Sequence, residues 1–276
     1  MRKIITILGL TLALASVQVA LSLPSHADTL VSSTAGNLGV SAAAGKANNI
    51  TITTNAVGQV FVSDTADVVR PSGGGCVSLT PNSVRCDGIF LVRVFAGDLD
   101  DQVTNNSAVS THQHGDAGDD LLTGGSGTDQ FFPGAGNDRV AGNGGDDRLQ
   151  ADLPVDGAED FAGGPGVDTA VYVTRTAALT ITLDGVADDG SAGEGDNLRT
   201  DVENVFAGSG SDNLTGNGSG NEFRAGGGSD VVRGLGGDDV LSATDGVAGN
   251  DRLDGAAGTD RCLSDAGDTE TACELN

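Results

Sequence analysis

The chain lacks the bulky aromatic residues that usually build a globular core. Its 276 residues include no tryptophan, one tyrosine and eight phenylalanines, whereas glycine occurs 44 times. Basic residues are also few, since 14 lysines and arginines stand against 39 acidic residues, a formal net charge of −25. A conventional core of aromatic and aliphatic bulk is therefore hard to build. Because nucleic acids and anionic membranes reward clusters of lysine and arginine, the composition also argues against both as partners.

Motifs of known catalytic chemistry are missing as well. A metalloprotease needs two histidines one helical turn apart with a glutamate as base, and the sequence has no such motif. Gly208-Ser209-Gly210 is a distorted nucleophile elbow inside a glycine-rich turn. His112 and His114 share one face of an extended segment and could bind a transition metal, but no cysteine or carboxylate stands at a supporting spacing. We interpret them as part of a surface loop and expect no enzyme activity.

What the chain does contain is a nine-residue repeat. Three copies follow one another directly at 124–132, 133–141 and 142–150. Thirteen copies fit this frame, at 96–104, 115–150, 151–162, 163–171, 207–242, 243–254 and 255–263, and those at 151–162 and 243–254 are each three residues longer than the others. Such a period predicts a stacked, repetitive fold.

Three positions of the frame are nearly constant. Position four is glycine in eleven of the thirteen copies, with Leu99 and Ser219 as the exceptions. Position eight is always apolar and holds Val103, Leu122, Phe131, Val140, Leu149, Phe161, Ala170, Leu214, Phe223, Val232, Leu241, Leu253 and Cys262. Position six holds Asp101, Asp120, Asp129, Asp138, Asp147, Asp168, Asp212, Asp230, Asp239, Asp251 and Asp260, with Glu159 and Asn221 in the other two copies.

Each constant position has a physical reason. Glycine reaches positive φ without steric cost, so glycines at positions one, two and four allow a tight turn whose carbonyls point inward, toward the position-six carboxylate. Ca²⁺ takes six to eight hard oxygen ligands at about 2.3–2.6 Å and tolerates irregular geometry. The last three residues suffice for a short strand with one inward apolar side chain, and stacked copies then form a narrow continuous core. The frame thus predicts calcium-binding turns between short strands.

The copies resemble the Gly-Gly-x-Gly-x-Asp-x-apolar-x nonapeptide of the RTX, or haemolysin-type, calcium-binding repeat. This resemblance implies an all-β fold, a parallel β-roll or β-helix, in which two copies make one coil and each Ca²⁺ lies between a turn and the turn two copies further on. It implies a ligand role for the eleven position-six aspartates. We expect weaker or empty sites at Asn221, Glu159 and Asp101, the last because Leu99 replaces the turn glycine and the off-pattern residues 105–114 follow.

Calcium is expected to control folding. Pairing turns two copies apart gives roughly four to eight sites. Without the ion, stacked carboxylates repel one another and the glycine-rich backbone loses much entropy on ordering. We therefore expect the repeats to fold only when calcium binds.

Residues 1–27 have the pattern of a signal peptide. Arg2 and Lys3 form a basic start, residues 4–23 are mostly apolar, and Ser25 and Ala27 are small residues at the two positions that signal peptidase reads. We expect export to give a secreted, extracellular protein with no membrane insertion after signal removal, and a retained membrane anchor is the alternative. RTX toxins and proteases typically leave the cell through a dedicated channel with an uncleaved C-terminal signal. This difference argues against a toxin.

Four cysteines fit an oxidising compartment. Of the three possible pairings, the two local bonds Cys76–Cys86 and Cys262–Cys273 are favoured because short loops close easily. The second bond would fold the tail, residues 264–276, over the open end of the roll as a cap.

Two further segments do not follow the frame. Residues 28–95 alternate in the β manner and predict an N-terminal β cap that runs into the first coil. Residues 172–206 separate repeat block 1 (96–171) from repeat block 2 (207–263), and we expect this spacer to continue the roll with longer loops. Its residues Asp188, Asp189, Glu194 and Asp196 could hold a further ion, although a solvated acidic loop is the favoured interpretation.

Two classes of function fit these features. The first is a stand-alone secreted calcium-binding β-roll with a structural or interaction role, whose cell-surface or protein partner the sequence does not specify. The alternative is a calcium-dependent adhesin or ligand-binding module. An accessory part of an extracellular enzyme is less favoured, because it would need a catalytic domain that the chain lacks.

Overall fold

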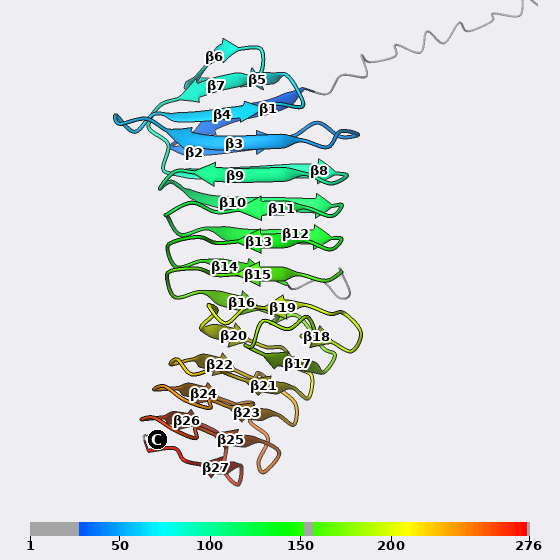
Figure 1. The fold of residues 1–276 in the computed structure, drawn as a ribbon, viewed down its shortest axis with the longest axis vertical. Coiled ribbons are helices and arrows are strands. Elements are labelled where there is room, and N and C mark those ends of the chain that lie inside the picture. Colours follow the sequence, from blue (N-terminus) through cyan, green and yellow to red (C-terminus); the bar gives the residue numbers. More distant parts are fainter. Residues whose placement is uncertain (1–27, 152–156, 275–276) are drawn as a thin grey trace, which may run out of the picture.

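The computed structural model describes residues 28–151 and 157–274, which form a long stack of short strands (Figure 1). No helix occurs among these residues, so none is available to cross a membrane. The all-β, parallel β-roll fold expected from the repeat is confirmed, because the repeat strands pair in parallel along the stack. The predicted signal peptide, 1–27, lies outside the described residues.

One face of the roll is a sheet that runs the whole length of the stack, here called sheet A. In spatial order its strands are β26 (Arg261–Leu263), β24 (Val240–Ser242), β22 (Glu222–Arg224), β20 (Asn204–Phe206), β16 (Thr169–Val171), β14 (Arg148–Gln150), β12 (Gln130–Ala135), β10 (Ser110–Ala117), β8 (Leu91–Asp98), β2 (Asn37–Ser41), β1 (Thr29–Thr34) and β5 (Val69–Pro71).

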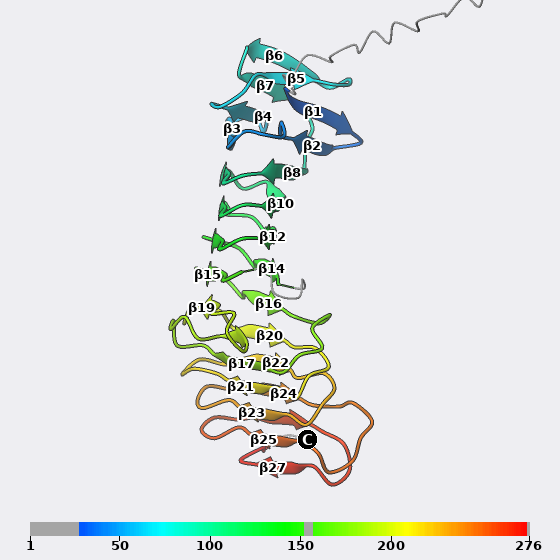
Figure 2. The same ribbon diagram turned by 90° about the vertical axis from the view of Figure 1, so that its right-hand side faces the viewer.

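The opposite face is divided between two sheets (Figure 2). Sheet B contains β19 (Asn197–Leu198), β15 (Asp160–Ala162), β13 (Arg139–Ala141), β11 (Leu121–Thr123), β9 (Gln102–Asn106), β3 (Asn49–Thr54), β4 (Val60–Asp64), β7 (Ser83–Cys86) and β6 (Cys76–Thr80). Sheet C contains β18 (Gly190–Ser191), β17 (Leu179–Thr182), β21 (Asn213–Thr215), β23 (Val231–Arg233), β25 (Arg252–Asp254) and β27 (Thr269–Thr271).

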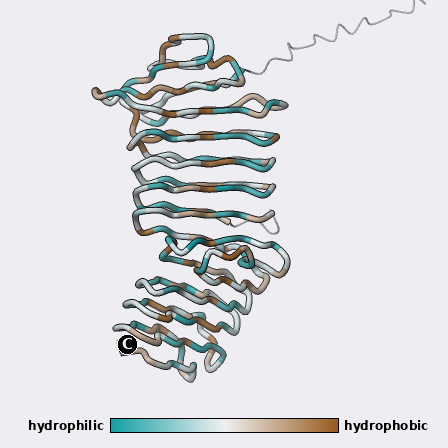
Figure 3. Tube along the Cα trace, viewed as in Figure 1, coloured by the Kyte–Doolittle hydropathy of each residue, from teal (hydrophilic) through white to brown (hydrophobic). Residues whose placement is uncertain are grey.

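Successive repeat copies alternate between the two faces, so that copies two apart lie in register. Phe131 pairs with Leu149 in sheet A, and Leu122 pairs with Val140 in sheet B. Every position-eight side chain is buried, with at most 2% exposed. Figure 3 shows apolar residues recurring in successive coils along the stack. A single inward side chain per strand therefore suffices for a continuous core.

The turns need residues without a Cβ where adjacent coils touch. Gly136, at position four, has φ 148°, and a Cβ added there would lie 1.9 Å from the Gly118 carbonyl oxygen of the preceding coil. Leu99 occupies the same position with φ 73°, and Leu235 has φ 74° at position two of its copy. These two leucines adopt a left-handed conformation that favours glycine, at a cost of roughly 1–2 kcal/mol each.

The N-terminal segment extends both faces. Parallel pairing of β2 with β8 and of β3 with β9 joins it to the roll, and antiparallel strands continue outward from there. The disulfide Cys76–Cys86 connects β6 and β7. Strand β8 crosses residue 95, so cap and first coil share a strand.

The spacer continues the roll but takes its strands out of order. After β16 the chain places β17 beside β21, turns back through β18, and then adds β19 to sheet B and β20 to sheet A. Sheet A is consequently unbroken, whereas the opposite face changes from sheet B to sheet C. The chain forms one roll with a joint in one face.

The tail adds a last strand at the C-terminal end. Strand β27 pairs in parallel with β25, and the amide of Glu274 donates to the Asp260 carbonyl at 3.0 Å. The predicted bond Cys262–Cys273 is present, so both local disulfides are confirmed. It connects a buried position-eight side chain to the tail.

Candidate metal centre

The position-six side chains form ladders along the edges of the roll. All thirteen are buried, with at most 4% exposed. The amide of Asp120 donates to Asp138 Oδ1 at 2.7 Å in the next coil, and that of Asp212 donates to Asp230 Oδ1 at 2.8 Å. One oxygen of each such carboxylate therefore joins its turn to the turn of the preceding coil.

Among the described residues, the second carboxylate oxygen finds no hydrogen-bond partner in ten of the eleven aspartates. Oδ2 is buried and unpaired in Asp101, Asp120, Asp138, Asp147, Asp168, Asp212, Asp230, Asp239, Asp251 and Asp260. A buried polar atom without a partner costs about 1–3 kcal/mol, and more when it is charged. Native structures rarely leave such groups unpaired unless an ion or water takes the place.

Backbone carbonyls converge on the same spaces. A Cβ added to Gly142 would lie 2.3 Å from Asp147 Oδ2 and 2.5 Å from the Gly163 carbonyl oxygen of the next coil. At Gly115 the corresponding contacts are 2.2 Å and 2.3 Å, with Asp120 Oδ2 and the Pro133 carbonyl. At these two turns, glycine at position one keeps the space between these oxygens open. Carboxylate and carbonyl oxygens are the hard donors that Ca²⁺ takes, so the residues present fit the ion.

Burial makes these carboxylates poor anions without a cation. Burial, followed by the neighbouring carboxylates, raises the pKa of Asp120, Asp147 and Asp168 from 3.8 to about 7. The pKa values of Asp101, Asp138, Asp230 and Asp239 rise to about 6, also mainly through burial. A divalent cation at the unpaired oxygens would stabilise the charged form and oppose these shifts.

Asp129 differs from the other predicted ligands. Its Oδ1 accepts hydrogen bonds from the Thr111 amide at 2.6 Å and the Thr111 hydroxyl at 2.7 Å, and its Oδ2 accepts from the Gly125 amide at 2.8 Å. Protein donors therefore satisfy both oxygens. Thr111 itself stands at position six of a degenerate copy within residues 105–114, which the sequence frame had skipped.

Three residues outside the thirteen copies occupy the same place in the ladder as a position-six residue. The Asn48 amide donates to Asp101 Oδ1 at 2.5 Å, as Asp101 does to Asp120 at 2.7 Å. Glu203 accepts from the Asp168 amide at 2.8 Å, and Asp196 from the Glu159 amide at 3.1 Å. The usable signal was a buried apolar residue two positions later, namely Ile50, Val205 and Leu198.

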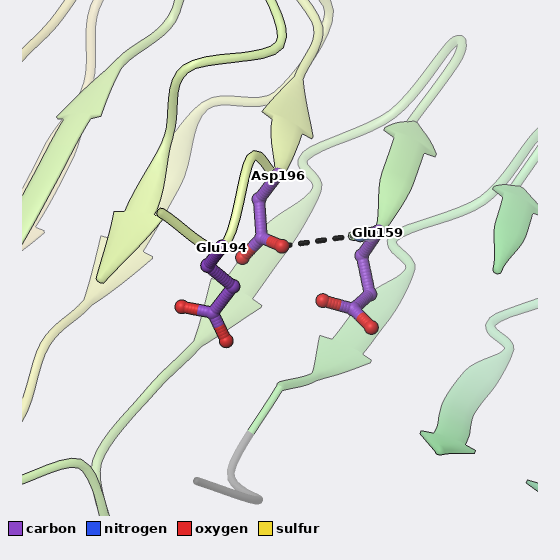
Figure 4. A group of neighbouring side chains, drawn as sticks. All are labelled: Glu159, Glu194 and Asp196. Carbon is purple, nitrogen blue, oxygen red and sulfur yellow. Dashed lines mark hydrogen bonds between the residues drawn. The ribbon is translucent and has the colours of Figure 1, made fainter. Parts of the chain in front are cut away.

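At the end of the sheet B ladder, three carboxylates lie close together, those of Glu159, Glu194 and Asp196 (Figure 4). Asp196 Oδ2 accepts a hydrogen bond from the Tyr172 hydroxyl at 2.9 Å. Glu194, which lies with Asp196 and Glu159 in a carboxylate cluster, pairs with the Arg175 guanidinium at 2.7 Å, and both side chains are at most 2% exposed. The spacer thus supplies its own cation here.

The interpretation of the spacer carboxylates as a solvated loop is wrong for Asp189, Glu194 and Asp196, and the side chain of Glu194 is buried. Asp189 and Asp196 are buried, with at most 1% exposed, whereas Asp188 is exposed. Asp189 accepts from the amides of Thr182 at 2.6 Å and Leu198 at 2.8 Å. These carboxylates connect out-of-order strands, which no local pattern indicates.

The two histidines also lie differently from the prediction. His112 and His114 belong to strand β10, not to a surface loop, because residues 110–114 continue the alternation of the neighbouring strands. The His114 ring stacks between Phe95 at 4.6 Å and Phe132 at 4.3 Å, centroid to centroid. The three rings form a row on the outer side of sheet A.

The arrangement of turns can be compared with known families. The model of the RTX calcium-binding nonapeptide repeat matches residues 114–140, 132–153, 206–241 and 245–269. The chain carries RTX calcium-binding nonapeptide repeats. These RTX matches fall in the repeat blocks and their borders, and leave the N-terminal cap and most of the spacer outside. Among curated proteins no match to the chain was found.

Proposed function

We propose that this chain is a secreted, non-enzymatic RTX protein whose roll folds on binding several Ca²⁺ ions and acts as a structural or interaction element outside the cell. The observation that carries the proposal is the series of ten buried carboxylate oxygens without a partner, each in a turn of the ladder. Their regular spacing along both edges of the roll supports a common ligand.

The charge of the chain supports a metal ion, rather than lysine or arginine side chains, as the partner of these oxygens. Only 14 basic residues stand against 39 acidic ones. Bound Ca²⁺ would neutralise the stacked carboxylates and join adjacent turns, so its binding free energy would become folding free energy. The Asp residues would hold the ion through Oδ2, and the position-one carbonyls of the next coil would complete its oxygen shell.

Export is supported by two independent features. The sequence of residues 1–27 has the basic, apolar and small-residue parts of a signal peptide. Two disulfides join residues 76 and 86, and 262 and 273, as suits an oxidising compartment. Immunoblotting of culture medium and cell fractions tests this part, and retention of the full-length chain in the membrane fraction would contradict it.

A calcium titration followed by circular dichroism tests the folding part. We expect chelator-stripped protein to gain β signal cooperatively with Ca²⁺ and not with Mg²⁺. Asp138→Asn and Asp239→Asn, one in each block, should shift the calcium midpoint upward, whereas Asp188→Asn, an exposed spacer carboxylate, should not. Full β signal in chelator at neutral pH, unchanged by calcium, would sink the proposal.

A ligand-binding module is the second candidate, favoured by the aromatic row on sheet A. Phe95 is 40% exposed although the chain is poor in aromatic residues. Stacked exposed rings suit the binding of flat or apolar ligands. Loss of cell-surface binding in Phe95→Ala, with calcium-dependent folding unchanged, would favour this role over a purely structural one.

A further inference from the structure

One turn of the roll offers more oxygen donors than its neighbours. In the regular turns, the residue that presents its carbonyl to the position-six side chain of the preceding coil has no side-chain oxygen, as at Pro133, Gly142, Gly163, Gly234, Gly255 and Ala272. Where block 1 meets the spacer, this place belongs to Asp201. A Cβ added to Gly163 would lie 2.4 Å from Asp168 Oδ2 and 2.5 Å from the Asp201 carbonyl oxygen.

The side chain of Asp201 is held beside this space. Its Oδ2 accepts a hydrogen bond from the Gly164 amide at 3.1 Å, and Gly164 directly follows the glycine that lines the space. Its Oδ1 is buried and has no hydrogen-bond partner within 28–151 and 157–274. One oxygen therefore orients the carboxylate, and the other remains available for a ligand.

Asp168 provides the other carboxylate of this turn. Its side chain is fully buried, Oδ1 accepts from the Asp147 amide at 2.8 Å, and Oδ2 is unpaired. The carboxylates of Glu203 and Asp201 both act on Asp168, adding to the effect of burial in raising its pKa. Asp168 Oδ2 and the Asp201 carbonyl oxygen thus border one space at Gly163, and the Asp201 side chain, held at the adjacent Gly164 amide, adds a second unpaired carboxylate oxygen to this turn.

We propose that Asp168 and the spacer residue Asp201 together hold a calcium ion at the joint between block 1 and the spacer, and that this site fills at lower calcium concentration than the turns with one carboxylate. The proposal rests on the calcium-binding function proposed above and adds a ligand from outside the repeat frame. Calcium affinity rises with the number of charged ligands, so a second carboxylate strengthens the site. The spacer then completes a metal site instead of interrupting the series.

Calorimetric titration and native mass spectrometry of the full protein with Ca²⁺ test the proposal. Wild-type protein should show a tight first step of about one ion. Asp201→Asn keeps an acceptor for the Gly164 amide but removes the charge, and should weaken that step tenfold or more while the later steps stay unchanged. Asp188→Asn, which removes an exposed charge from the same spacer, is the matched control and should behave as wild type.

A double-mutant cycle covers the case in which Asp201→Asn also disturbs folding. Calcium midpoints are compared for Asp168→Asn, Asp201→Asn and the double variant. If both residues hold one ion, the double variant should resemble the more affected single variant, whereas additive shifts would mean separate roles and overturn the proposal. Wild-type protein that binds no calcium would refute the proposed function itself. Calcium binding by wild type with an identical isotherm for Asp201→Asn would refute this site alone.

Discussion

Acid should replace calcium in folding the roll. The pKa of Asp147 rises from 3.8 to about 7 on folding, mainly through burial. A raised carboxylate pKa stabilises the fold when the group is protonated, so this contribution is present below about pH 4 and is lost as the pH rises through 7. One pKa unit corresponds to 1.36 kcal/mol, so ionisation of Asp147 costs about 4 kcal/mol of folding free energy. Relaxation of the structure and entry of water reduce this cost to about 2 kcal/mol.

The summed effect is large compared with the stability of a domain. Eight carboxylates have pKa values raised to about 6 or 7, namely Asp101, Asp120, Asp138, Asp147, Asp168, Asp189, Asp230 and Asp239. At about 2 kcal/mol each, their ionisation costs as much as the 5–15 kcal/mol that holds a typical domain together. Arg199 lowers the pKa of Asp160, which acts in the opposite direction but is one group.

Thermal unfolding followed by circular dichroism, in chelator and in excess calcium between pH 4.5 and 8, measures this effect. In chelator the midpoint should fall as the pH rises through 6–7. In calcium it should rise, because protons compete with the ion. Asp147→Asn should raise the chelator midpoint at pH 6 and lower the calcium midpoint. A chelator midpoint that stays constant or increases from pH 5 to 8 would refute the reasoning.

Three further outcomes follow from individual residues. Asp129→Asn should leave the calcium stoichiometry in calorimetry unchanged, because protein donors already satisfy its carboxylate, and the loss of an ion would contradict this. Gly136→Ala should destabilise the calcium-bound roll by about 3 kcal/mol or more in urea unfolding, since the new Cβ meets the Gly118 carbonyl, whereas Gly185→Ala, with positive φ but open space, should cost about 1 kcal/mol. Leu235→Gly should stabilise the roll by roughly 0.5 kcal/mol, because relief of the left-handed strain exceeds the added entropy of the unfolded chain, and a lower urea midpoint would argue against that balance.

The repeat made the roll predictable from sequence, because each regular copy contains a recognisable glycine turn, a short strand and one apolar core residue. Copies that lack both the glycine turn and the aspartate were not predicted. Thr111 and Gln113 stand at positions six and eight of a degenerate copy, and Gln113 is a buried polar residue at a core position. Asn48 has an amide instead of a carboxylate and no glycine at position four. The apolar Ile50 marks the Asn48 turn, whereas the Thr111 turn is revealed only by the stacking of its strand on regular copies.

The strand pairing of the spacer could not be predicted from the sequence for a different reason. Its place in the fold depends on pairing between strands that are not neighbours in sequence, such as β17 with β21 and β15 with β19. Asp201 and Glu203 become site residues only because residues 199–203 stack on the turn of block 1. A local pattern of carboxylates cannot separate such residues from the exposed Asp188.

The two faces of the roll should differ in their resistance to bending, because sheet A is unbroken and the opposite face is not. Along this face every coil from β8 to β26 is hydrogen-bonded to the next, so a load along the axis passes from coil to coil through this ladder. The other face changes from sheet B to sheet C at the spacer, and among the described residues no strand pairing joins these two sheets. A load across the axis should therefore bend the molecule at residues 172–206, with sheet A as the bending axis. The two repeat blocks on either side of the spacer would then move as rigid bodies.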